Sequence, residues 1–156
     1  MNKSVRQSAG ILLFKKVNKT TNFFLVHPGG PFWQNKDAGA WSIPKGEFTG
    51  EEEPLDAAVR EFKEETGSAI SGHFIQLSPV KLKSGKLVHA WAVEGDIDVK
   101  EIKCETFISI EWPPRSGKFR SVPEVDKGEW FSFDEAKTKI NPAQVALIDE
   151  LTRKIG

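Results

Sequence analysis

The segment Gly46-Glu-Phe-Thr-Gly-Glu-Glu52, followed by Arg60-Glu-Phe-Lys-Glu-Glu-Thr-Gly67, carries the clearest pattern in the sequence. Between these two runs, apolar residues recur at helical spacing, at Leu55, Ala58, Val59 and Phe62. Pro54 suits the first turn of a helix, and Gly67 suits the position just after its end. The spacing predicts an amphipathic helix over residues 53–66.

Three glutamates of this predicted helix share one face. At about 100° per residue, Glu61, Glu64 and Glu65 lie within an arc of roughly 100°, beside the apolar face. Two unit charges ~4 Å apart repel by about 4 kcal/mol at an effective dielectric constant of about 20, so a partly buried cluster needs a cation. Carboxylates without nearby histidine or cysteine suit Mg²⁺ or Mn²⁺, which keep positions open for water and phosphate oxygens. A solvated acidic helix face fits the same spacing, and the spacing alone leaves both interpretations open.

The same segment resembles the Nudix box, whose pattern is Gly, five residues, Glu, seven residues, then Arg-Glu-apolar-x-Glu-Glu-x-Gly. Seven identities at fixed spacing arise by chance in a chain of this length with a probability of roughly 10⁻⁶. The chain is therefore identified as similar to the Nudix hydrolase superfamily, with MutT-like and diadenosine-tetraphosphate-hydrolase-like proteins as its relatives. Ser68 departs from the pattern, because the family prefers an aliphatic residue there, but this position contributes no ligand.

The resemblance implies roles for the residues of the box. The glutamates that match Glu61, Glu64 and Glu65 bind divalent metal in the family, and the carbonyl of the glycine that matches Gly46 often joins them. The glutamate that matches Glu52 pairs with the arginine of the box, here Arg60, and this pair supports the loop on the helix.

A further carboxylate, Glu124, lies six residues before Trp130. Relatives of the MutT and diadenosine tetraphosphate hydrolase types carry a glutamate at a matching offset before a tryptophan, where it serves as metal ligand or general base. The implied reaction is hydrolysis by a metal-activated water without a covalent intermediate. Glu61, Glu64 and Glu124 are the candidate catalytic residues, and the sequence leaves the base open between Glu64 and Glu124; Glu124 is alternatively a turn residue.

Other segments alternate between strand and helix signals. Strands are predicted over 8–14 and 23–27, a hairpin over 74–81 and 86–93, and further strands at 106–112 and 129–131. The C-terminal part is predicted to be helical over 133–139 and 142–155. With no repeat and no long linker, residues 1–156 form one domain with an α/β (α+β) fold, and the resemblance implies a Nudix-type α/β/α sandwich around a mixed sheet.

Six residues outside the carboxylate set are candidates for substrate contact. Arg115, Lys118 and Arg120 form a basic segment between predicted strands that suits distal phosphates, although an exposed loop has the same composition. Lys45 lies directly before the box, and Gln144 lies in a region where MutT-type relatives contact the base. Trp33 lies in a long loop over 28–40, where it either stacks on a base or belongs to the core.

Composition limits the function. In 156 residues, 22 Lys and Arg balance 22 Asp and Glu, so no global field attracts nucleic acid or a membrane surface. The single Cys104 excludes an internal disulfide and, with the polar start Met1–Gln7, favours a cytoplasmic protein; its apolar neighbours predict a buried thiol.

The expected substrate is a nucleoside diphosphate linked to a further group, most simply a dinucleoside polyphosphate such as diadenosine tetraphosphate, or a nucleoside triphosphate. Two alternatives remain open. One is a MutT-type enzyme that removes non-standard nucleoside triphosphates. The other is a Nudix module that senses a nucleotide without catalysis. The oligomeric state stays unknown.

Overall fold

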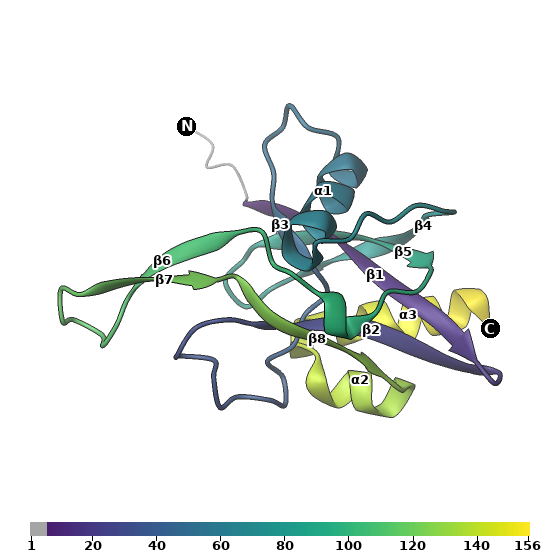
Figure 1. The fold of residues 1–156 in the computed structure, drawn as a ribbon. Helices are drawn as coiled ribbons and strands as arrows, with labels where there is room; N and C mark the ends of the chain where they lie inside the picture. The colour runs from purple at the N-terminus through teal and green to yellow at the C-terminus, as the bar shows by residue number, and fades with distance from the viewer. Residues whose placement is uncertain (1–5) are drawn as a thin grey trace.

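A mixed six-stranded sheet forms the centre of the molecule (Figure 1). The structure is a computed structural model that describes residues 6–156, so part of the polar start predicted from Met1–Gln7 lies outside the described residues. The strands of the sheet are β1 (Gln7–Val17), β2 (Thr20–Pro28), β3 (Lys45–Glu47), β4 (Ile75–Lys81), β5 (Leu87–Glu94) and β8 (Val125–Phe131). Their order is β4-β5-β1-β2-β8, with β3 paired to β1; β1 and β5 run parallel, and the other pairs are antiparallel.

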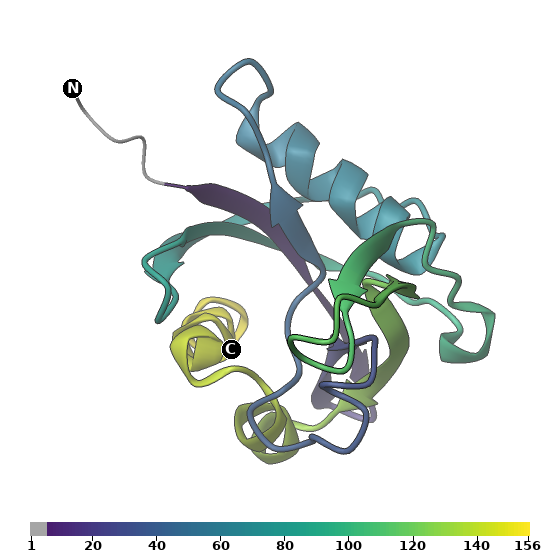
Figure 2. The same ribbon diagram turned by 90° about the vertical axis from the view of Figure 1, so that its left-hand side faces the viewer.

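Helices cover both faces of this sheet, as Figure 2 shows. Helix α1 (Pro54–Thr66) lies on one face, and α2 (Phe133–Lys139) and α3 (Val145–Ile155) lie on the other. Two short 3₁₀ helices, η1 (Val99–Glu101) and η2 (Pro142–Gln144), lie in the connections. The predicted α/β/α sandwich around a mixed sheet is confirmed.

The side-chain alternation of β1 explains the two layers. Leu12 and Phe14 point into the core under α2 and α3, whereas Ile11 and Leu13 point into the core under α1. All four side chains are buried, because a central strand with helices on both faces exposes neither side.

The ends of α1 follow the predicted signals. Pro54 occupies the first turn, and Gly67 adopts the left-handed conformation at φ 80°, where its N–H donates to the Lys63 carbonyl at 2.7 Å. The helix therefore ends where the sequence predicted, immediately after the glutamate cluster.

A separate hairpin made of β6 (Phe107–Glu111) and β7 (Phe119–Pro123) projects away from the main sheet (Figure 1). The sequence predicted β6 but not β7, and it predicted only the last three residues of β8. Strand β3 was also missed, since its three residues carry too short a pattern to distinguish a strand from a loop.

One prediction about a single side chain is wrong. Cys104 is only half-buried, whereas the sequence predicted a buried thiol. The apolar neighbours that suggested burial belong to the projecting hairpin, where Phe107 and Ile108 are exposed.

Candidate active site

Strand β3 and helix α1 bring Gly46 and Glu61 into direct contact. Gly46 pairs with Ala9 of β1, and α1 packs across the same strands. A Cβ atom on Gly46 would overlap the carboxylate of Glu61, so this carboxylate keeps its position only while residue 46 has no side chain. The glycine of the box thus allows a carboxylate of the helix to lie directly on the backbone of β3.

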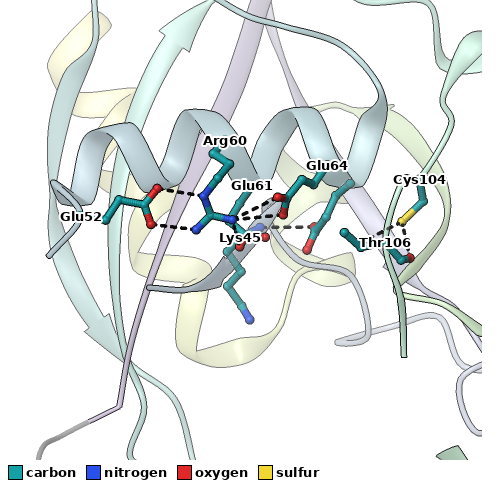
Figure 3. Close-up of polar contacts among 8 residues, drawn as sticks. Lys45, Glu52, Arg60, Glu61, Glu64, Cys104 and Thr106 are labelled. Atoms are coloured by element: carbon teal, nitrogen blue, oxygen red, sulfur yellow. Dashed lines mark hydrogen bonds and ion pairs between the residues drawn. The ribbon is translucent and has the colours of Figure 1, made fainter. Parts of the chain in front are cut away.

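Arg60 is the centre of an ion-pair network on the exposed side of α1 (Figure 3). Its guanidinium donates to both oxygens of Glu52, at 2.8 and 2.9 Å. Its Nη1 atom also donates to Glu61 at 2.8 Å and to Glu64 at 3.2 Å. Hydrogen bonds to these carboxylates, above all to Glu52, raise the pKa of Arg60, and the bond to Arg60 lowers the pKa of Glu52.

Glu65 faces inward, where it is 5% exposed. The backbone N–H of Lys45 donates to its Oε1 at 3.3 Å. Burial raises the pKa of Glu65 to about 8, the positive charge of Lys45 lowers it, and the negative charges of Glu124 and Glu61 raise it further. A carboxylate in this position is poorly solvated and gains from a nearby positive charge.

Burial is also the main cause that raises the pKa of Glu61. The hydrogen bond from Arg60 opposes this shift, while the charges of Glu64 and Glu124 add to it. The charge of Glu124 thus acts on both buried glutamates of the box, Glu61 and Glu65.

A cavity of about 160 Å³ lies between the box and the bend that joins β7 to β8. Lys45, Glu65 and Glu124 contribute its charged lining, beside Val26, Ser42 and Ile43. Burial lowers the pKa of Lys45, and the nearby Lys86 lowers it further. The backbone of Glu124 is fixed on both sides, since its N–H donates to Thr106 and its carbonyl accepts from Gly29, both at 3.1 Å.

Whether these residues suit a metal ion depends on the type of their donor atoms and on how those atoms are arranged. The donors are carboxylate oxygens, as Mg²⁺ and Mn²⁺ prefer, and two of them, on Glu61 and Glu65, are buried with raised pKa values. Within residues 6–156, however, no three histidine, cysteine, aspartate or glutamate side chains converge into a metal site. Glu61 and Glu64 are turned towards Arg60 instead, so the residues fit a divalent cation in chemistry while the guanidinium supplies the positive charge in this structure.

Gln144 lies behind the cavity wall and is 1% exposed. Its Oε1 accepts from the N–H of Ile43 at 3.1 Å, and its Nε2 donates to the hydroxyl of Ser42 at 3.0 Å. The side chain is thereby used within the protein, and it fixes two residues that line the cavity.

The structure does not bring the other substrate candidates to the cavity. Arg115, Lys118 and Arg120 are exposed on the β6–β7 hairpin. Trp33 is half-buried and packs against Phe32, with 5.0 Å between the ring centroids. Sequence reasoning also missed the wall residues Ser42 and Ile43; they belong to the lead-in to the box, but their role depends on contacts with Gln144, about a hundred residues away in the chain.

The fold and the site define a class of α/β/α proteins in which a loop, a short strand and a helix present clustered carboxylates beside a cavity. The model of one family, described as the NUDIX domain, matches residues 5–151. The chain belongs to this family, which confirms the resemblance found in the sequence and the enzyme class that it implied, a Nudix hydrolase. Within residues 6–156, no helix is long and apolar enough to span a membrane.

Solved structures of the same fold include three with similar lengths. A binary complex of an Ap4A hydrolase from C. elegans is 20% identical, with a TM-score of 0.66 over 97% of this chain and 98% of that one. The NUDIX domain of NrtR from Shewanella oneidensis, complexed with ADP ribose, is 16% identical, with a TM-score of 0.69 over 99% and 91%. A MutT protein from Methanosarcina mazei Go1 is 18% identical, with a TM-score of 0.62 over 99% and 98%.

Proposed function

We propose that this protein hydrolyses a diphosphate linkage in a nucleoside diphosphate derivative, with Mg²⁺ or Mn²⁺ as cofactor. The observation that carries the proposal is the cavity that places Lys45 and Glu124 beside the buried Glu65 of the box. A lysine ammonium attracts phosphate oxygens, and the carboxylates suit the cation that accompanies a diphosphate. This combination favours a phosphate ester or anhydride over a neutral ligand.

The residues proposed to hold the cation are Glu61, Glu64 and Glu65, with the carbonyl of Gly46, and Glu124 serves either as a further ligand or as the general base. When bound, a divalent cation neutralises diphosphate oxygens and lowers the pKa of a coordinated water. To bind the cation, Glu61 and Glu64 would give up their hydrogen bonds with Arg60, and Arg60 would keep its two hydrogen bonds to Glu52. The Glu52–Arg60 pair therefore supports the loop in both arrangements.

The protein's own groups then have separate tasks. Lys45 orients a phosphate in the cavity, and two backbone hydrogen bonds hold the main chain from which the Glu124 carboxylate reaches the cavity. The attacking water gives its proton to a carboxylate oxygen of Glu64 or Glu124. Most of the acceleration comes from positioning and charge stabilisation, as in phosphoryl transfer generally.

For the substrate we propose a dinucleoside polyphosphate of the diadenosine tetraphosphate kind, or a nucleoside triphosphate. The fold shared with an Ap4A hydrolase and with a domain complexed with ADP ribose supports a nucleotide ligand. A MutT-type enzyme acting on non-standard triphosphates is the alternative within the same chemistry. We further propose that residues 1–156 act as one Nudix domain in the cytoplasm, where the single Cys104 stays reduced.

The test is a substrate panel in Mg²⁺, resolved by chromatography. The panel contains diadenosine tetraphosphate, nucleoside triphosphates, ADP-ribose and nucleotide sugars, and Glu64→Gln is assayed in parallel. Glu51→Gln is the matched control, because Glu51 is exposed at the start of the same region. We expect one class to be cleaved, Glu64→Gln to lose that activity, and Glu51→Gln to keep it.

Two outcomes would overturn parts of the proposal. Release of pyrophosphate from triphosphates, without cleavage of dinucleoside polyphosphates, would favour the MutT-type alternative. Nucleotide binding without turnover in Mg²⁺ or Mn²⁺ would favour a sensing module that does not catalyse hydrolysis.

A further inference from the structure

The β6–β7 hairpin exposes an unusual share of the large apolar side chains. Phe107 is 61% exposed, Ile108 44% and Phe119 68%. The hairpin also carries the basic residues Arg115, Lys118 and Arg120, all of them exposed. Three cationic groups gathered on one element suit a ligand that has several phosphates.

Strand register divides these residues between two faces. Ile108 lies opposite Val122, and Ile110 lies opposite Arg120. The ladder continues at both ends, because Glu124 donates to Thr106 and Trp112 donates to Lys118 through their backbone N–H groups. Since residues two apart on a strand share a face, Arg120 shares one face of β7 with Val122. Lys118 and Trp112 follow beyond the open end of the two strands, and Glu124 follows at the bend after β7. Phe107 and Phe119 lie on the other face, and Arg115 lies in the turn.

The strand that carries Arg120 leads back to the candidate active site through Val122 and the bend at Glu124. Glu124 lines the cavity itself, and Val122 beside it is buried close to Gly30. At about 3.3 Å per residue, Arg120 lies roughly 13 Å from Glu124 and Lys118 roughly 20 Å. This row of positions leads outward from the proposed site of hydrolysis.

The two cations in this row have no acidic partner. Among residues 6–156, neither Arg120 nor Lys118 forms an ion pair, whereas Lys63 and Lys86 do. The only carboxylate of the hairpin, on Glu111, already accepts from the backbone N–H groups of Arg115 and Gly117, at 3.0 and 3.2 Å. The positive charge of this row is therefore free for an anionic ligand.

We propose that this part of the hairpin binds the far nucleotide of a dinucleoside polyphosphate, with Arg120 and Lys118 at its phosphates and Trp112 against its base. The inference rests on the proposed function and specifies its substrate class. A mononucleoside triphosphate held in the cavity lacks the second nucleoside that would extend along the strand. The hairpin thus selects for substrates with a nucleoside at both ends.

Arginine substitutions on and off this face test the proposal. Arg120→Ser removes a charge from the face, and Arg115→Ser removes the same charge from the turn. We expect Arg120→Ser to lower kcat/KM for diadenosine tetraphosphate about tenfold, the loss of one charge-assisted hydrogen bond. With ATP we expect Arg120→Ser to change kcat/KM by no more than about twofold, as for a screened surface charge. Arg115→Ser should change kcat/KM by no more than about twofold with either substrate. In calorimetric titrations with diadenosine tetraphosphate in EDTA, Arg120→Ser should bind more weakly than the wild-type protein, and Arg115→Ser should bind about as well as the wild-type protein.

Equal effects of Arg120→Ser and Arg115→Ser, or equal losses with both substrates, would overturn the inference while the proposed hydrolysis stands. If the wild-type protein cleaves no diphosphate, the proposed function fails, and the titration in EDTA still decides whether Arg120 contributes to binding. Tighter Arg120-dependent binding of a single-stranded oligoribonucleotide would replace the proposed ligand by a nucleic acid.

Discussion

Arg60 holds the carboxylate of Glu52 with two hydrogen bonds, from Nε to Oε2 at 2.8 Å and from Nη2 to Oε1 at 2.9 Å. The remaining nitrogen, Nη1, points to Glu61 and Glu64. One guanidinium therefore joins the loop before α1 to two of the proposed metal ligands, and its planar fork is what makes both contacts possible.

Replacing Arg60 by lysine tests the importance of this fork. Lysine keeps the charge, but it cannot hold Glu52 with two bonds and still reach Glu61. Because the pair is partly exposed, we expect Arg60→Lys to lower the free energy of unfolding by only about 1 kcal/mol, measured by urea denaturation in EDTA. Lys63→Arg on the same helix is the control, and an equal effect of the two variants would show that charge alone matters.

Stability without metal should decrease as the pH rises, because of Glu65. Burial raises the pKa of this group in the folded protein from 4.5 to about 8, so between these values the folded state binds more protons than the unfolded state. The contribution of Glu65 is present below pH 4.5 and is lost as the pH passes through about 8. The limiting slope for one group is about 1.4 kcal/mol per pH unit.

Urea denaturation in EDTA between pH 5 and 8 measures this slope, a window that lies within the shifted range of Glu65. Glu65→Gln should make stability less dependent on pH, whereas Glu51→Gln, at an exposed position, should not. If the free energy of unfolding of Glu65→Gln changed with pH as steeply as that of the wild-type protein, another group would be responsible for the pH dependence.

Gly46 should accept a side chain only if the Glu61 carboxylate moves. A Cβ atom there would overlap the Glu61 carboxylate, which would have to move away from β3. We expect Gly46→Ala to lower turnover about a hundredfold, because it displaces a proposed metal ligand. The free energy of unfolding should change by less than about 1 kcal/mol, because the displaced atoms are the end of a flexible side chain. Gly50→Ala is the control, because its Cβ atom would meet nothing within 4 Å. Similar turnover of the two variants would argue against the close contact of Gly46 and Glu61.

Gln144 should support the cavity wall through its two bonds. Gln144→Met keeps the shape of the side chain but leaves the N–H of Ile43 without its acceptor. An unsatisfied buried N–H costs about 1–3 kcal/mol, so we expect a loss of this size in thermal or urea unfolding. Gln34→Met, in an exposed loop, should change stability by less than about 0.5 kcal/mol. An unchanged Gln144→Met would mean that Ile43 finds another acceptor.

Local patterns predicted the helix and its glutamate cluster because their information lies within about four helical turns of chain. Pro54 and Gly67 mark the ends of α1 by their own backbone preferences, and the structure confirms both. Likewise, β1 and β2 are strongly apolar and are covered by helices on both faces, so their existence was clear from sequence, although β1 extends beyond the predicted range to Val17.

Long-range contacts account for what sequence missed. Strand β7 carries no apolar alternation strong enough to identify it, and its pairing with β6 determines that Arg120 shares a face with Val122. The wall formed by Ser42 and Ile43 depends on Gln144, from the opposite end of the chain. The side chains of Glu61 and Glu64 turn towards Arg60, and the spacing of residues in the sequence does not determine such side-chain conformations.

The general base can be assigned by comparing Glu124 with Glu64. Both oxygens of Glu64 contact Arg60, whereas the side chain of Glu124 lines the cavity and, among residues 6–156, has no hydrogen-bond partner. We therefore expect Glu124→Gln to lower kcat by about 10²–10³ fold while Mn²⁺ binding, followed by electron paramagnetic resonance, changes little. Glu64→Gln should instead weaken Mn²⁺ binding along with turnover.

Loss of Mn²⁺ binding in Glu124→Gln, with Glu64→Gln retaining it, would exchange the two roles. Rescue of the rate gives a second readout. A variant that lacks the general base should regain rate as the hydroxide concentration rises. A variant with weakened metal binding should regain rate when Mn²⁺ is added. Glu129→Gln on the exposed side of β8 is the control for a lost charge near Glu124, and it should retain both rate and metal affinity. The combination of rate, metal affinity and rescue thus separates a proton acceptor from a metal ligand at two carboxylates that sequence alone could not distinguish.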